Sequence, residues 1–213
     1  MEIVWYGHAC FRLRGKDITI ITDPYGEGYG YSPPRIRADI VTISHENRDH
    51  NYAEAIQGDP KVIRGPGEYE IGGVFITGIV TYHDAEEGGK RGKNTVYLFD
   101  WEDLAICHLG DLGHIPTQTD MERLGDIDIL LIPVGGVYTI DAAQASEVIS
   151  LLEPKIVIPM HYRAKALTGS ELAPISRFLK EMGLREAAPQ PSLRVVSGTL
   201  PAETQVIVLQ HKG

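Results

Sequence analysis

The segment S-H-E-N-R-D-H-N-Y, residues 44–52, places three side chains that can bind a metal ion close together: His45, Asp49 and His50. Imidazole and carboxylate ligands suit zinc, iron, manganese or cobalt. In extended backbone, residues two apart point the same way, so His45 and Asn47 could share one ion while Asp49 and His50 reach a second. Two ions about 3.5–4 Å apart can hold a bridging hydroxide that attacks an ester, lactone, amide or phosphoester bond.

Three more candidate ligands each follow an apolar segment that has the character of a buried strand. The segments are V-F-I-T-G-I-V-T-Y before His83, L-A-I-C-H-L-G before Asp111 and K-I-V-I-P-M before His161. A single histidine after a strand is more often a hydrogen-bonding group than a ligand. Because four separate strands deliver candidate ligands near their ends, we predict one metal centre built on the loops of a rigid scaffold.

Short β-rich segments separated by glycine or charged turns predict the strands of that scaffold. Two of the segments read as hairpins, one turning at Gly72-Gly73 and one near Glu102-Asp103. The predicted strands and hairpins are residues 2–6, 10–14, 17–22, 38–44, 61–65, 67–82, 94–110, 128–134 and 155–160, with two more strands within 193–210.

Helices are fewer in this pattern. A helix over 142–153 is predicted, with Thr139 or Asp141 as its cap, and a second over 169–183 with Ser170 as its cap. A short helix is also expected within 52–58. Many short strands with few amphipathic helices predict packed sheets covered outside by helices. No repeat or linker divides the chain, so we expect a single domain over residues 1–213.

Composition narrows the classes of partner. The formal net charge of −9 disfavours a phosphate backbone, and the densest basic stretch, G-G-K-R-G-K-N, directly follows D-A-E-E. Nucleic acid is therefore a poor expectation. No apolar run approaches the roughly 20 residues that span a bilayer, so no membrane is expected. Cys10 and Cys107 lie in apolar stretches and read as buried thiols, and no secretory signal is visible, which favours the cytoplasm.

With these residues in place, the chain resembles the metallo-β-lactamase superfamily, whose pattern is H-x-H-x-D-H plus a later His, Asp and His. More closely it resembles the compact metal-dependent hydrolases related to L-ascorbate-6-phosphate lactonase. The segments that match in order are W-Y-G-H-A-C-F-R-L, I-T-D-P-Y, S-H-E-N-R-D-H, G-P-G-E-Y-E-I-G-G, H-L-G-D-L-G-H, P-V-G-G-V-Y-T-I-D and I-P-M-H-Y. The resemblance implies an α/β fold, a four-layer αββα sandwich with its site at one edge of the two sheets.

The resemblance also implies a ligand set for one or two divalent ions, zinc first, with manganese or iron as alternatives. The first ion would be held by His45 and His83, with position 47 as its third protein ligand. The second ion would be held by Asp49, His50 and His161. Asp111 would bridge the two ions.

Three residues have expected roles beside the ions. His8 matches an early motif and could donate to a substrate or bridge through water; its simpler interpretation is a strand-end hydrogen bond. Asp23 could orient a ligand histidine by accepting its second N–H, or merely form an Asp-Pro turn. Asp49 could act as a general base as well as a ligand.

Asn47 departs from the family pattern, which has histidine at this position. An amide oxygen is a neutral and weak donor compared with imidazole. The Asn47 carbonyl could still coordinate and favour manganese, iron or magnesium. Alternatively, the first site is empty and one ion works alone, or the protein has lost turnover and kept a binding role.

Two loops are expected to flank the site, residues 25–38 and 84–94, and both have the composition of mobile lids. Their basic residues could meet an anionic substrate or could be solvated surface charge. His114 is expected either to donate a proton or to serve a supporting role. The basic residues concerned are Arg35, Arg37, Lys90, Arg91 and Lys93.

Together these features predict a metal-dependent hydrolase that uses a metal-bound hydroxide on an ester, lactone or phosphoester bond of a small molecule. The alternative from another class is a non-catalytic metal- or ligand-binding protein on the same fold, with Asn47 as the trace of lost catalysis. A nuclease is a third interpretation, against which the acidic balance counts.

Overall fold

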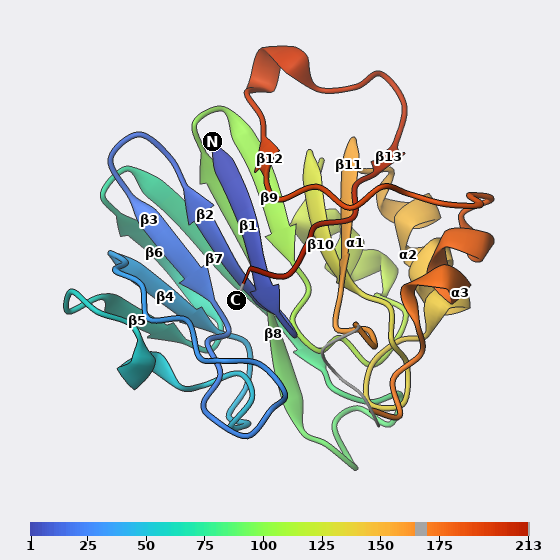
Figure 1. The fold of residues 1–213 in the computed structure, drawn as a ribbon, viewed down its shortest axis with the longest axis horizontal. Coiled ribbons are helices and arrows are strands. Elements are labelled where there is room, and N and C mark those ends of the chain that lie inside the picture. Colours follow the sequence, from blue (N-terminus) through green and yellow to red (C-terminus); the bar gives the residue numbers. More distant parts are fainter. Residues whose placement is uncertain (165–169, 213) are drawn as a thin grey trace.

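The computed structural model describes residues 1–164 and 170–212. Two β-sheets face each other, and the three α-helices gather beside the strands β9, β10 and β11 of one sheet (Figure 1). This sandwich of two mixed sheets confirms the predicted fold class. In the described part of the chain, no helix is long and apolar enough to cross a membrane.

The first sheet has the order β12-β1-β2-β3-β4-β5. Its β1, β2 and β3 run antiparallel, whereas β3, β4 and β5 run parallel, so β3 and β4 end at the same edge. The bounds are β1 Glu2–Gly7, β2 Cys10–Arg14, β3 Thr19–Thr22, β4 Ile40–Ile43, β5 Lys61–Arg64 and β12 Leu193–Arg194.

The second sheet has the order β13-β11-β10-β9-β8-β7-β6. Strands β9, β10, β11 and β13 are parallel, and β6 to β9 form antiparallel pairs. The bounds are β6 Gly67–Ile71, β7 Val74–Tyr82, β8 Lys93–Trp101, β9 Leu104–His108, β10 Ile129–Pro133, β11 Ile156–Met160 and β13 Gln205–Val206. Both hairpin turns lie where they were predicted, between β6 and β7 and between β8 and β9.

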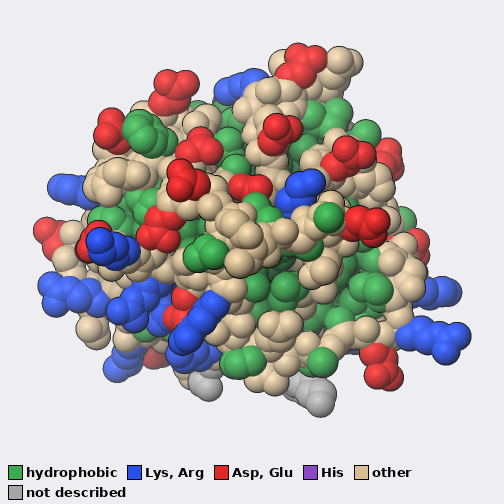
Figure 2. Space-filling model, turned by 90° about the horizontal axis from the view of Figure 1, so that it is seen from above, with side chains coloured by type: hydrophobic (Ala, Val, Ile, Leu, Met, Phe, Trp, Pro, Cys, Tyr) green, Lys and Arg blue, Asp and Glu red, His purple; other side chains and the backbone are tan. Residues whose placement is uncertain are grey.

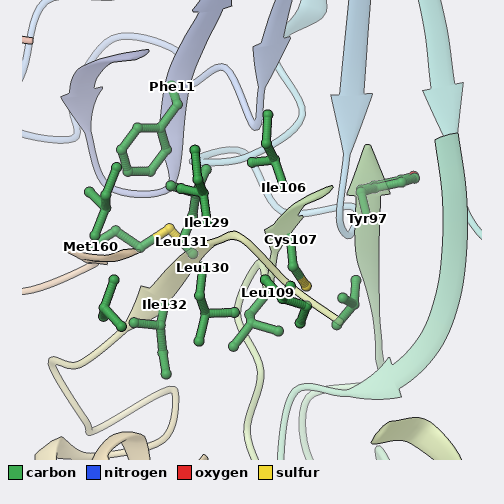
Figure 3. Packing of buried hydrophobic residues seen from close by; sticks show 14 of the residues in the cluster. Phe11, Tyr97, Ile106, Cys107, Leu109, Ile129, Leu130, Leu131, Ile132 and Met160 are labelled. Carbon is green, nitrogen blue, oxygen red and sulfur yellow. The ribbon is translucent and has the colours of Figure 1, made fainter. Parts of the chain in front are cut away.

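Alternating side chains divide the first sheet between two hydrophobic clusters. Trp5 and Phe11 face the second sheet, and Figure 3 shows Phe11 beside Met160 of β11. The opposite face of the same sheet packs against Tyr25 and Tyr31 of the loop that follows β3. This loop, rather than an α-helix, covers the outer face of the first sheet, because its buried tyrosines supply the apolar area that a helix would otherwise bring.

The three α-helices are α1 Gln118–Leu124, α2 Ala142–Leu152 and α3 Ile175–Glu181. Helix α2 confirms the expected helix over 142–153, with Asp141 as its cap, whose side chain accepts the Gln144 N–H. Helix α1 was not predicted, although Thr117 and Asp120 form a capping box at its start. Within 52–58 the chain forms only one 3₁₀ turn, Ala53–Ala55.

The expected helix over 169–183 is wrong in its first third. Residue 169 lies outside the described residues, and α3 begins only after Pro174. The segment of residues 170–174 is not helical because its backbone is bonded elsewhere: Ala173 donates to the Gly135 carbonyl and accepts from the Arg163 N–H. Ser170 does not cap a helix, since its hydroxyl oxygen accepts the N–H of Leu172.

Charged side chains of both signs are interspersed over the face seen in Figure 2, and no histidine is visible there. None of the eight histidines in the chain is an exposed residue. The histidine side chains therefore lie inside the molecule or are partly buried at its surface. Three of them, His45, His83 and His161, directly follow strands β4, β7 and β11 or lie within two residues of their ends.

Candidate metal centre

Six of the predicted ligands meet where strands of both sheets end. His45, Asp49 and His50 follow β4 of the first sheet, and the other three follow β7, β9 and β11 of the second. The Oδ2 atom of Asp111 lies at the middle of this group. It is 3.3 Å from Nε2 of both His50 and His83, with the remaining two histidines slightly further away, at 3.6 Å for His161 and 4.0 Å for His45.

The six side chains form two groups that match the two expected ion sites. His45, His83 and Asp111 offer ligand atoms within 4.8 Å of one another, and so do the members of the other group. That second group is Asp49, His50 and His161. Because the Asp111 carboxylate also approaches His50 and His161, it is placed between the two groups, where a bridging ligand belongs.

The polar atoms of these six residues are in a state that suits the binding of divalent ions. The Nε2 atoms of His45 and His50 are buried and lack a hydrogen-bond partner, and the same holds for Oδ1 of Asp49 and Asp111. Buried polar atoms without a partner are costly and rare in folded proteins. Cations bound by these residues would supply the partners that such atoms lack among the described residues.

A relay of hydrogen bonds fixes the rings of two ligand histidines. Asp23, at the end of β3, accepts the Ser44 hydroxyl at 2.6 Å and Nδ1 of His50 at 3.0 Å. Because the Ser44 proton goes to Asp23, the Ser44 oxygen is free to accept from Nδ1 of His45 at 2.9 Å. Both rings therefore keep a proton on Nδ1, which leaves Nε2 as the nitrogen that would face an ion.

The charges of the centre are tuned by burial and by one another. Burial acts to raise the pKa of Asp111, but His161 and His50 hold it well below its usual range. Burial lowers the pKa of His45 to about 4, assisted by His50. Burial also acts to lower the pKa of His50, yet Asp111 and Asp23 on its two sides raise it well above normal. Without an ion the centre thus pairs an ionised Asp111 with a protonated His50, and an ion would bind by displacing the proton on Nε2 of His50.

Three residues at the strand ends adopt the left-handed conformation that is uncommon for side-chain-bearing residues. Their φ angles are 45° at His8, 39° at Asp23 and 50° at His161. Such conformations cost on the order of 1–3 kcal/mol each and persist where surrounding bonds enforce them. Here the His161 N–H donates to the His8 carbonyl at 3.2 Å, and the Trp5 indole donates to the same oxygen at 3.0 Å.

Two glycines permit the backbone to come close behind the ligands. A Cβ at Gly113 would lie 2.3 Å from the Asp84 nitrogen and 2.3 Å from the His83 carbonyl carbon. A Cβ at Gly135 would lie 2.1 Å from the His161 oxygen. Real Cβ atoms do not approach backbone so closely, so a larger residue at either position would displace a ligand.

A cavity of about 1100 Å³ opens over the six side chains and is large enough for a small molecule. Asn47 lies on its wall as an exposed residue. Its Oδ1 accepts the N–H of Arg48 at 3.0 Å, so this oxygen is engaged locally. Asn47 as a metal ligand remains a prediction.

The structure revises the expected role of two other histidines. His8 lines the cavity, but its Nε2 donates to the Tyr29 carbonyl at 2.8 Å, leaving Nδ1 as an acceptor. His114 accepts the Tyr82 N–H at Nε2 and donates from Nδ1 to the Ile115 carbonyl. Because both of its ring nitrogens are used by backbone, His114 has a supporting role.

The loop over residues 84–94 is tied down by bonds rather than free to act as a lid. Asp84 accepts four backbone N–H groups from within the loop, and the His83 N–H donates to the Gly92 carbonyl at 3.0 Å. The sequence D-A-E-E-G-G does not predict these hydrogen bonds, because nothing near Asp84 in the sequence indicates that its side chain is buried. Arg91 and Lys93 line the cavity, whereas Lys90, Arg35 and Arg37 do not.

Sequence reasoning missed several residues that support the centre. Asn94 is fully buried; its Oδ1 accepts the Asp111 N–H at 3.0 Å, and its amide donates to the Leu109 carbonyl. Ser44 completes the relay from Asp23. Its position directly before a candidate ligand, at the end of a predicted strand, was the signal available for it.

A family model described as the beta-lactamase superfamily domain matches residues 2–161, which include all six clustered side chains. The chain belongs to the metallo-beta-lactamase superfamily. A UPF0173 protein of Pyrococcus abyssi is 32% identical, across 76% of this chain and 83% of the relative. A UPF0173 metal-dependent hydrolase of Thermoplasma volcanium is 31% identical with the same shares covered.

Within this superfamily the chain also matches a solved structure over almost its whole length. The crystal structure of a candidate Zn-dependent hydrolase of the metallo-beta-lactamase superfamily from Thermotoga maritima is 41% identical to it. The match covers 98% of this chain and 97% of the Thermotoga chain, with a TM-score of 0.82. The chain is therefore a member of the UPF0173 group of the superfamily.

Proposed function

We propose that this protein is a metal-dependent hydrolase that cleaves an ester, lactone or phosphoester bond of a small molecule. The observation that carries the proposal is the position of Asp111, whose Oδ2 lies within 4.0 Å of four histidine Nε2 atoms. The names of UPF0173 relatives, which describe them as metal-dependent hydrolases, agree with it.

Two ions would be held, one by each group of ligands. The first would bind to His45, His83 and Asp111, and the second to Asp49, His50 and His161, with Asp111 shared. Nitrogen and carboxylate ligands in such small numbers favour zinc, with manganese or iron as alternatives. When bound, the ions would acidify a water molecule and polarise the bond to be cleaved.

Asn47 leaves the first ion with a smaller protein ligand set than the superfamily pattern provides. Because the Asn47 oxygen accepts from the Arg48 N–H, the protein would hold this ion with His45, His83 and Asp111, and the ion could also take a water molecule from the cavity. An open position is what distinguishes catalytic from structural zinc sites. We therefore infer that the substitution weakens the first site and does not abolish turnover.

Two residues at the cavity would act on the substrate side. Asp49 has a side chain that is 19% exposed, more than its ligand neighbours, which suits a ligand that also accepts a proton from water. His8 is neutral at pH 7, because burial lowers its pKa to about 4. With Nε2 given to Tyr29, its Nδ1 would accept from a substrate hydroxyl or from a water molecule.

The experiment that tests this proposal measures metal content and turnover on the same samples. Metal per chain would be determined by inductively coupled plasma mass spectrometry after reconstitution with zinc, manganese and iron. Each sample would then be assayed on a panel of lactones, carboxylic esters and phosphoesters, with Asp111→Asn as the inactive control. Metal binding without turnover of any substrate would favour the non-catalytic alternative, and no metal in any sample would overturn the hydrolase proposal.

A link to L-ascorbate-6-phosphate lactonases rests on sequence resemblance alone, so lactones enter the panel as one class among three. The cytoplasm is proposed as the compartment because Cys10 and Cys107 are both buried and unpaired thiols.

A further inference from the structure

Three basic side chains line the cavity of a protein whose formal net charge is −9. Arg64 ends β5, Arg91 lies in the loop after His83, and Lys93 begins β8. All three line the cavity, near the ends of β5 and β7 and the start of β8. A gathering of cations against the overall charge of the chain is the expected mark of a site for anions.

Arg91 is held at the cavity through both its backbone and its guanidinium group. Its backbone N–H donates to Oδ2 of Asp84 at 2.7 Å. Its guanidinium donates from Nη2 to the Val137 carbonyl at 3.2 Å and lies over the Tyr138 ring, 5.4 Å from the ring centre. The side chain therefore spans from its own loop to the loop after β10, with its head fixed on the far side.

Asp84 organises the backbone from which Arg91 projects. Its Oδ1 accepts the N–H groups of Glu86 and Gly88, and its Oδ2 accepts those of Lys90 and Arg91. The Asp84 side chain is buried, and these four bonds hold the loop in one conformation.

Within residues 1–164 and 170–212, Arg91 and Lys93 keep side-chain donors that no other group of the protein uses. A guanidinium has five N–H donors, and that of Arg91 gives one to Val137. Among the residues that the structure describes, Lys93 makes no ion pair within 4.0 Å, whereas Arg64 donates to Glu46 at 2.8 Å. Lys90 of the same loop differs, because it pairs with Glu86 and does not line the cavity.

We propose that Arg91 and Lys93, assisted by Arg64, bind an anionic oxygen group of the substrate, a phosphate or a carboxylate, and that Asp84 is the residue that positions Arg91. The inference rests on the proposed function, since it names the substrate class of the same cavity. The planar fork of Arg91 fits two oxygens at once, and Lys93 adds a mobile point charge. The anionic group would sit beside the ions and orient the bond to be cleaved.

Isothermal titration calorimetry on the protein as purified would measure its affinity for inorganic phosphate and for acetate. This measurement tests the proposal independently of turnover. We expect Arg91→Ala and Lys93→Ala each to weaken binding of one or both anions by roughly tenfold, as loss of one charge-assisted bond implies. Lys90→Ala is the matched control on the same loop and should bind as the wild type does. Equal affinities in wild type, Arg91→Ala and Lys93→Ala would overturn the anion site.

The positioning role of Asp84 is tested by a double-mutant cycle. If Asp84 acts through Arg91, Asp84→Asn weakens anion binding while Asp84→Asn/Arg91→Ala binds no more weakly than Arg91→Ala. Losses that add would refute this role. Arg91→Lys, which keeps the charge and lacks the fork, is the second variant should Asp84→Asn fail to fold; wild-type affinity in Arg91→Lys would contradict a positioned guanidinium.

The two proposals fail in distinguishable ways. Anion binding that depends on Arg91, in a protein that hydrolyses nothing on the panel, would sink the hydrolase and keep the anion site. Turnover of neutral and anionic esters with the same KM, unchanged in Arg91→Ala, would keep the hydrolase and sink the anion site. A rise in KM for anionic esters alone, with kcat retained, is the result we expect.

Discussion

His50 donates from Nδ1 to Oδ2 of Asp23 at 3.0 Å, and both side chains are fully buried. Asp23 directly follows β3, and His50 lies in the segment that follows the neighbouring strand β4 of the same sheet, so the bond joins the segments after two adjacent strands. Through Ser44 the same carboxylate also controls His45. One residue that binds no ion thus orients a ligand in each of the two groups.

Replacing Asp23 should impair both ion sites at once. In Asp23→Asn the amide NH₂ would face a donor, and the His50 ring would lose the acceptor that fixes it. Loss of such a partner typically lowers metal affinity by about 10–100-fold. Competition with a coloured zinc chelator measures the effect, and the exposed Asp126→Asn is the control. Wild-type affinity in Asp23→Asn would show that the relay does not orient the ligands.

Restoring histidine at position 47 should strengthen the first site selectively. Asn47→His adds an imidazole beside His45 and His83, and one added zinc ligand is expected to raise affinity by at least roughly tenfold. Metal content at limiting zinc should then approach two ions per chain in the variant and stay lower in the wild type. Equal content in both proteins would mean that position 47 contributes nothing to the first site.

A methyl group at Gly113 should push the ligand-bearing backbones apart. The Cβ would meet the peptide between His83 and Asp84 at 2.3 Å, so the segment carrying Asp111 must move. We expect Gly113→Ala to lose about 2 kcal/mol or more of stability and to bind the first ion more weakly. Urea unfolding and metal titration measure this against Gly198→Ala, whose Cβ meets nothing within 4 Å.

Acid should destabilise the metal-free protein partly through His8. Burial, followed by His161, lowers the pKa of His8 from 6.5 to about 4. Between these values the unfolded chain binds a proton that the folded chain does not, so stability is complete above pH 6.5 and falls as the pH drops toward 4. The slope from one such group is at most about 1.4 kcal/mol per pH unit.

The variant His8→Gln isolates that contribution. It cannot titrate, yet its amide can still donate to the Tyr29 carbonyl. Urea unfolding of metal-free protein at several pH values should therefore give a shallower loss of stability for His8→Gln than for the wild type. Parallel curves for the two proteins would mean that His8 titrates normally in the folded state.

The positions of the candidate ligands could be predicted because each follows a strongly apolar strand. Alternating and continuous apolar segments indicate where strands end, and the candidate ligands after four such ends converge because these strands of both sheets end on the same side of the sandwich. The non-helical course of residues 170–174 could not be predicted in the same way. It depends on backbone bonds of Ala173 with Gly135 and Arg163, which are distant in the sequence.

The state of the loops was equally hidden from local sequence. Asp84 looks like one of several acidic loop residues, and only the folded backbone shows four N–H groups directed at it. Tyr25 and Tyr31 look like components of a flexible Gly-Tyr-Pro loop, yet they seal the outside of the first sheet. Both cases depend on contacts that no periodicity records.

Each group of ligands draws on both sheets. The first takes His45 from one sheet and His83 and Asp111 from the other, and the second likewise combines residues following β4 with His161. An ion at either site is therefore a cross-link between the two halves of the sandwich. By mass action, an ion present at 100 times its dissociation constant adds about 2.7 kcal/mol to the free energy of unfolding. The supply of metal in the cell would consequently set how long the folded chain survives its proteases, independently of any substrate.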